Sequence, residues 1–232
     1  MWGPTVLGPN DIMLVKVCGI TRPEDANEAV ACGAGALGFV FWPKSPRFVD
    51  PYRARAIVRS LPPFIATVGV FVNQPPEYVN GVASLVGLSA VQLHGDETPA
   101  FAAEMRRPVI KAIAIGGGTD GAVVDGWADR VTLLLDADDP QKRGGTGRTI
   151  DWTRAAALAA ARRVVLSGGL TPDNVVDAIR TVRPFGIDVS SGVEMSPGVK
   201  DHGRLKALFE ALTERTVAAT KNDDHKHHPS RS

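Results

Sequence analysis

Short apolar runs recur along the chain, and a segment with helical spacing separates each run from the next. Apolar residues fill these runs without alternating with polar ones, which is typical of parallel strands covered on both faces. The predicted strands are Leu14–Cys18, Ala36–Phe41, Ala66–Phe71, Ala90–Leu93, Val109–Ile115, Arg130–Asp136, Val164–Leu166 and a last run that contains Asp188 and Val189.

Helix signals lie between the strands, where proline or an acidic residue often opens the segment. The predicted helices run from near Arg22 to Ala31, from Asp50 to about Ser60, from Pro75 onward, from Pro99 to Arg106, from Asp151 to Arg162, from Thr171 onward and from about Gly203 to Leu212, with a weakly helical segment from Gly121 to Trp127. Eight strand–helix units in about 200 residues predict the α/β class and a single (βα)8 TIM barrel. A doubly wound open sheet is the alternative, although it more often carries one dominant glycine-rich turn at its start.

The two ends of the chain lack this pattern. Residues 1–12 mix Gly, Pro and single apolar residues, so we expect a flexible extension there and the barrel over residues 13–215. Residues 216–232 are polar and contain histidines, and we expect a disordered tail. Adventitious metal binding by this tail is the less favoured interpretation, and we predict no metal site.

Composition narrows the class of partner. The chain has 232 residues with 26 basic and 25 acidic side chains, and the net charge of +1 does not favour nucleic-acid binding. Cys18 and Cys32 have neither metal-ligand nor redox spacing, which fits a reducing cytoplasm. Neither a membrane-spanning run nor a signal sequence is recognisable, so we expect a soluble cytoplasmic protein without a membrane partner.

Polar residues at the predicted strand ends are the candidates for chemistry, because the carboxyl ends of barrel strands open into one mouth. These residues are Cys18, Gln92, His94, Asp136 and Asp188, together with Arg47 in the loop after the second strand. Cys18 alone could be a buried hydrophobe. Asp136 must be exposed or paired, because an uncompensated buried carboxylate is costly. Lys16 shares a face of the first strand with Cys18, and a nearby ammonium favours a thiolate.

Two late turns lack bulky side chains and suit a phosphate. Gly168 and Gly169 follow the seventh strand, and Ser190, Ser191 and Gly192 follow the eighth. Small residues let an anion approach the main-chain N–H groups, and the last two loops of a (βα)8 barrel often hold a substrate phosphate. The glycine-rich segment 144–147 could also wrap a phosphate or serve as a lid, but it fits no dinucleotide or P-loop spacing.

Taken together, these segments resemble the phosphoribosylanthranilate isomerase family, over residues from about 14 to 212. The segments that carry the resemblance are KVCGIT at 16–21, GFVFWPKSPR at 38–47, VGVFVN at 68–73, VQLHGDE at 91–97, LLDA at 134–137, GGTG at 144–147, SGGL at 167–170 and DVSSGVE at 188–194. Each segment alone is weak, but eight of them in the right order are specific. Trp42 stands where the family often has tyrosine, and Ser167 where alanine is common.

The resemblance implies the Amadori rearrangement of N-(5-phosphoribosyl)anthranilate, a small-molecule substrate, in tryptophan biosynthesis without a cofactor. By this resemblance Cys18 is the general base, Asp136 the general acid, and Arg47 the group that holds the anthranilate carboxylate. Further substrate contacts would come from Gln92 and His94, and phosphate contacts from Gly145, Gly168, Gly169, Ser190, Ser191 and Gly192. Asp188 could orient the anthranilate amine or pair with Lys16.

Two other functions remain open at this point. A related isomerase could also act on the aminoaldose of histidine biosynthesis, although such barrels typically use two aspartates where this chain has Cys18 and Asp136. Alternatively, the barrel could bind phosphosugars without turning them over. A monomer is the default expectation for the oligomeric state.

Overall fold

The computed structural model describes residues 13–115, 124, 126–137 and 150–224, with side chains described up to residue 214. Eight parallel strands close into a barrel in the order of the sequence, with β8 pairing back to β1. The strands are β1 (Leu14–Cys18), β2 (Ala36–Val40), β3 (Ala66–Phe71), β4 (Ala90–Leu93), β5 (Val109–Ile115), β6 (Thr132–Ala137), β7 (Val164–Leu166) and β8 (Gly186–Val189). The predicted (βα)8 barrel is therefore confirmed, and the open sheet is excluded.

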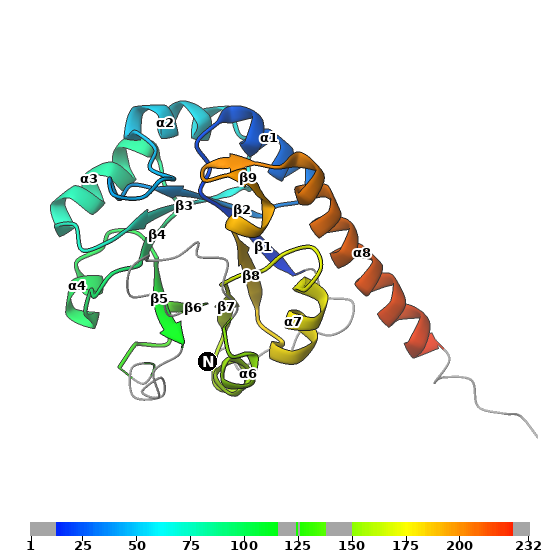
Figure 1. Cartoon of the computed structure of the whole chain (residues 1–232). Helices are drawn as coiled ribbons and strands as arrows, with labels where there is room; N and C mark the ends of the chain where they lie inside the picture. Colours follow the sequence, from blue (N-terminus) through cyan, green and yellow to red (C-terminus); the bar gives the residue numbers. More distant parts are fainter. Residues whose placement is uncertain (1–12, 116–123, 125, 138–149, 225–232) are drawn as a thin grey trace, which may run out of the picture.

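Helices surround the barrel on its outside (Figure 1). They are α1 (Pro23–Cys32), α2 (Pro51–Ser60), α3 (Pro76–Val86), α4 (Pro99–Ala103), α6 (Trp152–Ala161), α7 (Val175–Val182) and α8 (His202–Asp224). Asp50 and Asp151, at which two of the helices were predicted to start, each accept hydrogen bonds from two main-chain N–H groups of the following turn and so cap these helices. Most of the weakly helical segment from Gly121 to Trp127 lies outside the described residues.

Two helices are shorter than the pattern predicts. α4 ends at Ala103 rather than Arg106, because the Asn80 side chain donates to Glu104 O and accepts from Arg106 N, and these bonds replace a further helical turn. α7 begins at Val175, after the predicted Thr171 start. The Asn174 side chain instead bonds the Thr171 and Gly169 main chain and holds residues 171–174 as a turn.

The chain after β8 departs most from the predicted pattern. A short 3-10 turn, Ser191–Val193, leads into an antiparallel ribbon of β9 (Glu194–Ser196) and β10 (Val199–Lys200), which the sequence analysis missed. α8 then runs to Asp224, past the predicted end at Leu212, and extends beyond the barrel in Figure 1. The domain boundaries drawn at residues 12 and 215 stay predictions.

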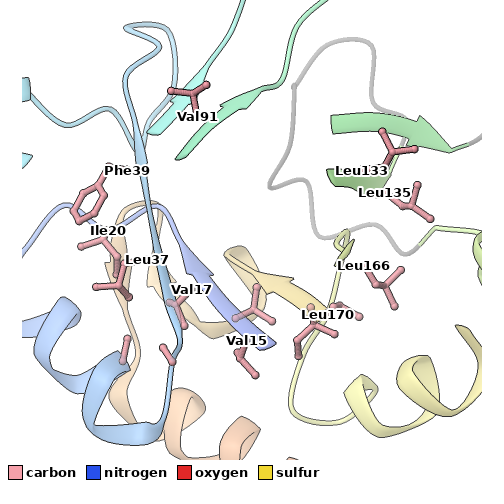
Figure 2. Close-up of a cluster of buried hydrophobic side chains, with 14 of the residues drawn as sticks. Val15, Val17, Ile20, Leu37, Phe39, Val91, Leu133, Leu135, Leu166 and Leu170 are labelled. Carbon is pink, nitrogen blue, oxygen red and sulfur yellow. The ribbon is translucent and has the colours of Figure 1, made fainter. Parts of the chain in front are cut away.

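Alternation along the strands sorts the side chains into an outer and an inner set. Outward residues such as Val17 of β1 and Leu133 of β6 join the large cluster that packs against the helices (Figure 2). Inward residues form two small clusters, one of which contains Cys18 and the other Leu134. Polar inward residues therefore need partners inside the barrel, and these partners build the site.

Candidate active site

Seven of the predicted residues line one pocket at the carboxyl ends of the strands. They are Cys18 from β1, Arg47 from the loop after β2, Gln92 and His94 from the end of β4, Asp136 from β6, Asp188 from β8 and Ser190 directly after β8. Cys18 and Asp136 lie 118 positions apart in the sequence, yet they line the same pocket. The structure thus brings together the two residues on which the acid and base interpretation depends.

Cys18 lies next to a buried ion pair. Lys16 and Asp188 are register partners on β1 and β8, and Lys16 Nζ donates to Asp188 Oδ1 at 2.9 Å. Gly38, the register partner of Cys18 on β2, leaves room for both groups. A Cβ atom there would lie 2.7 Å from Cys18 Sγ and 3.0 Å from Lys16 Nζ. Pairing with Lys16 is one of the two roles left open for Asp188, and the structure shows this contact.

Burial and charge oppose each other at the thiol. Burial raises the pKa of Cys18 above its ordinary value, because the thiolate would lose its hydration. The Lys16 ammonium opposes this shift, and Lys200 does so more weakly. Burial would also lower the pKa of Lys16, but the charges of Asp188 and Cys18 and the hydrogen bonds to them together outweigh burial and raise it. Lys16 is therefore a permanent cation beside the sulfur.

Asp136 is one of three polar side chains that lie in contact across the mouth. Its Oδ2 lies 3.2 Å from His94 Nε2, and its Oδ1 accepts from Ala137 N at 2.9 Å. His94 Nδ1 in turn lies 2.9 Å from Gln92 Nε2. The two ring nitrogens of His94 thus face two different side chains, the Gln92 amide and the Asp136 carboxylate. The predicted substrate residue His94 thus contacts the proposed acid, and Gln92 contacts His94.

Arg47 is held by a carboxylate that the sequence analysis did not connect with it. Its Nε donates to Glu194 Oε1 at 2.9 Å and its Nη2 to Glu194 Oε2 at 2.6 Å, with both residues buried. A guanidinium has a second edge, between Nη1 and Nη2. This is the edge with which Arg47 could bind a substrate carboxylate in two places while Glu194 stays bound.

The two predicted phosphate turns line one further hollow, which shares Asp136, Ser167, Asp188 and Ser190 with the first pocket. Its remaining lining residues are Gly168, Gly169, Leu170, Ser191 and Gly192. Gly168 has a φ of 87°, and a Cβ atom there would lie 2.9 Å from Ala137 N. A Cβ atom on Gly192 would collide with the Leu170 carbonyl oxygen. Glycine is thus required where the two loops meet. Gly145 lies outside the described residues.

Glu194 and Lys200 are the buried residues at the site that sequence reasoning missed. Both belong to the β9–β10 ribbon, and Lys200 Nζ donates to Glu194 Oε1 at 2.8 Å. A signal was present, because Pro197-Gly198 between two short segments is typical of a tight hairpin turn. Gly198 indeed has a positive φ of 80°.

Among the described residues, no group of three or more His, Cys, Asp or Glu side chains is arranged to hold a metal ion. Cys18 and Cys32 are both free thiols. In the part of the chain that the structure describes, no helix combines the length and apolar character needed to cross a bilayer.

A closed parallel barrel whose ionisable side chains converge at the carboxyl ends of the strands defines an enzyme of the (βα)8 class. The family model described as N-(5'phosphoribosyl)anthranilate (PRA) isomerase matches residues 15–211. The N-(5'-phosphoribosyl)anthranilate isomerase of Pelobacter propionicus is 49% identical over 208 residues, which cover 89% of this chain and 99% of that protein.

Solved structures agree with this match. The phosphoribosyl anthranilate isomerase of Thermotoga maritima has a TM-score of 0.82 at 45% identity, covering 88% of this chain and all of that one (100%). A phosphoribosyl anthranilate isomerase in complex with reduced 1-(o-carboxyphenylamino)-1-deoxyribulose 5-phosphate has a TM-score of 0.78 at 43% identity, with coverage of 88% and 100%. The chain belongs to the N-(5'-phosphoribosyl)anthranilate isomerase family.

Proposed function

We propose that Cys18 is the general base and Asp136 the general acid of the isomerisation that defines this family. The reaction is the Amadori rearrangement of N-(5-phosphoribosyl)anthranilate to 1-(2-carboxyphenylamino)-1-deoxyribulose 5-phosphate, a step of tryptophan biosynthesis. The observation that carries the two roles is that both side chains line one pocket, which continues into the hollow between the two small-residue loops.

The chemistry needs two proton transfers. An acid protonates the furanose ring oxygen, the bond from that oxygen to C1 breaks, and the nitrogen lone pair forms the Schiff base. A base then removes the proton from C2, which leaves an enolamine that tautomerises to the ketone. Asp136, in contact with His94, is the proposed proton donor, and the Cys18 thiolate beside Lys16 the proposed acceptor.

The remaining contacts follow from the shape of the site. The Nη1–Nη2 edge of Arg47 is proposed to bind the anthranilate carboxylate, with Gln92, His94 and Asp188 lining the space between the carboxylate and the sugar. The phosphate is proposed to bind between the two small-residue loops, at Gly168, Gly169, Ser190, Ser191 and Gly192. These half-buried loops are accessible to a ligand, and their main-chain N–H groups suit an anion.

Substitution of the acid and the base tests these roles. Purified protein is mixed with N-(5-phosphoribosyl)anthranilate, and the loss of substrate fluorescence is followed. Cys18→Ser and Asp136→Asn should each lower kcat by about 10²- to 10⁴-fold. Cys32→Ser is the matched control. It removes the second thiol of the chain, which lies on α1, and should retain turnover. Wild-type activity in either of the first two variants would falsify the role assigned to that residue.

Binding of the small-molecule substrate fits the complex known for a related structure. A cytoplasmic location fits a biosynthetic enzyme and stays a prediction, as does the monomeric state. Light scattering on the purified protein tests the latter.

A further inference from the structure

Lys200 is a charged side chain with 0% exposure, placed where the (βα)8 barrel does not require it. It lies on β10, and the eight barrel strands close without this ribbon. Complete burial of an ammonium is costly unless the charge is paired and its donors are satisfied. The hydrogen-bond partners of Lys200 therefore indicate which parts of the structure the buried ammonium holds together.

The ammonium joins three parts of the site. Lys200 Nζ donates to Cys18 O at 2.5 Å, to Ser190 O at 3.3 Å and to Glu194 Oε1 at 2.8 Å. Cys18 carries the proposed base, Ser190 belongs to a proposed phosphate loop, and Glu194 holds Arg47. The Ser190 hydroxyl also donates to Cys18 O at 3.2 Å. Residues about 180 positions apart in the sequence thus meet at one nitrogen.

Lysine suits this position for a chemical reason. An ammonium has three donors around one atom, and here three acceptors from different segments surround it. The planar fork of arginine directs its donors along fixed edges and does not converge on a point. A shorter or apolar side chain would leave the carbonyl oxygens of Cys18 and Ser190 without this partner.

We propose that Lys200 is a positioning residue of the isomerase, which holds the strand end bearing the Cys18 base at a fixed distance from the Ser190 phosphate loop. The inference rests on the proposed function of these two groups. A phosphate anchored in the loop then places C2 of the opened sugar at the sulfur. A displacement of about 1 Å at such a site lowers the rate on the order of 10²-fold.

Lys200→Met removes the ammonium and keeps a side chain of similar length. We expect kcat to fall by about 10- to 100-fold, and the dissociation constant of inorganic phosphate, measured by calorimetry, to rise by about 10-fold. Lys111→Met is the matched control. Lys111 is also buried, is paired with Glu97 at 2.9 Å and donates to a loop carbonyl, Gly95 O. The Lys111→Met variant should have a lower Tm than the wild type and the same phosphate affinity.

The proposal is overturned if Lys200→Met lowers Tm as Lys111→Met does but retains both kcat and the phosphate affinity of the wild type. If Lys200→Met does not fold, Lys200→Gln is measured in the same way. Its shorter neutral side chain retains N–H donors, so it should fall between wild type and the expected Lys200→Met values, and wild-type values would again reject the proposal. If the wild type fails to convert phosphoribosylanthranilate, that result by itself rejects only the proposed function. The phosphate-binding measurement still tests the role of Lys200 in that case, because calorimetry needs no turnover.

Discussion

Lys16→Met should raise the pKa of the Cys18 thiol and slow catalysis at neutral pH. Burial alone raises this pKa, and the Lys16 ammonium is the strongest opposing influence. Removing the ammonium leaves the thiolate facing the buried Asp188 carboxylate, which also disfavours a second negative charge. The thiol would then ionise only at higher pH.

The size of the effect follows from the distance. Sγ of Cys18 and Nζ of Lys16 lie 2.7 Å and 3.0 Å from the same point above Gly38, so they are less than about 6 Å apart. At an effective dielectric constant of about 20, two unit charges at about 6 Å interact by about 3 kcal/mol, which corresponds to a factor of about 100 in an equilibrium constant. The thiolate fraction below the pKa, and with it kcat/KM, should therefore fall by about 100-fold.

The assay is the rate of Cys18 alkylation by iodoacetamide between pH 6 and 10, in a Cys32→Ser background and followed by mass spectrometry. Lys16→Met should move the midpoint to higher pH, and kcat/KM for phosphoribosylanthranilate should move in parallel. Asp188→Asn tests the direction of the shift. This variant removes the carboxylate and keeps the ammonium, so the midpoint of Cys18 alkylation should move to lower pH. An unchanged midpoint in Lys16→Met, or shifts of the same sign in both variants, would refute the reasoning.

Two further predictions concern packing and acid stability. Gly38→Ala places a methyl group 2.7 Å from Cys18 Sγ, so it should lower stability by about 1–3 kcal/mol and displace the thiol, as thermal unfolding and turnover would show; wild-type values of both would contradict this. Burial alone would raise the pKa of Glu194, but hydrogen bonds from Arg47 and the charge of Lys200 hold it below its ordinary value of 4.5. A lowered pKa in the folded state stabilises the protein above pH 4.5 and loses this effect as the pH falls through the folded value. Tm should thus fall on acidification below 4.5, and less steeply in Glu194→Gln; equal slopes would show that Glu194 is not responsible.

Much of the fold was predictable because its signals are local. Uninterrupted apolar runs and acidic helix starts such as Asp50 and Asp151 depend on a few neighbouring positions, and each run and both starts match an observed element. Errors occurred where a distant side chain competes with local preference. Asn80 on α3 ends α4 early, and no spacing within α4 indicates this.

The site, too, has a part that local sequence patterns predicted and a part that they did not. Strand alternation placed Lys16 beside Cys18 and the eight-unit pattern placed Asp136 at the same mouth, because all parallel strands of a barrel end at one face. The hydrogen bonds from Arg47 to Glu194 could not be predicted, since the two residues lie 147 positions apart and meet only through closure of the barrel.

By itself, the order of apolar runs and small-residue turns determined that the chain is a (βα)8 barrel. The polar residues at the predicted strand ends identified the candidates for the proposed chemistry. Only the tertiary structure decided which groups touch: the His94 contact to Asp136, the placement of the Lys16 charge near the thiol, and the meeting of base and phosphate loop at Lys200. The physical reason is range. Backbone preferences act over a few residues, whereas hydrogen bonds and charges act over a few ångströms, and only folding brings residues this far apart in the sequence to such distances.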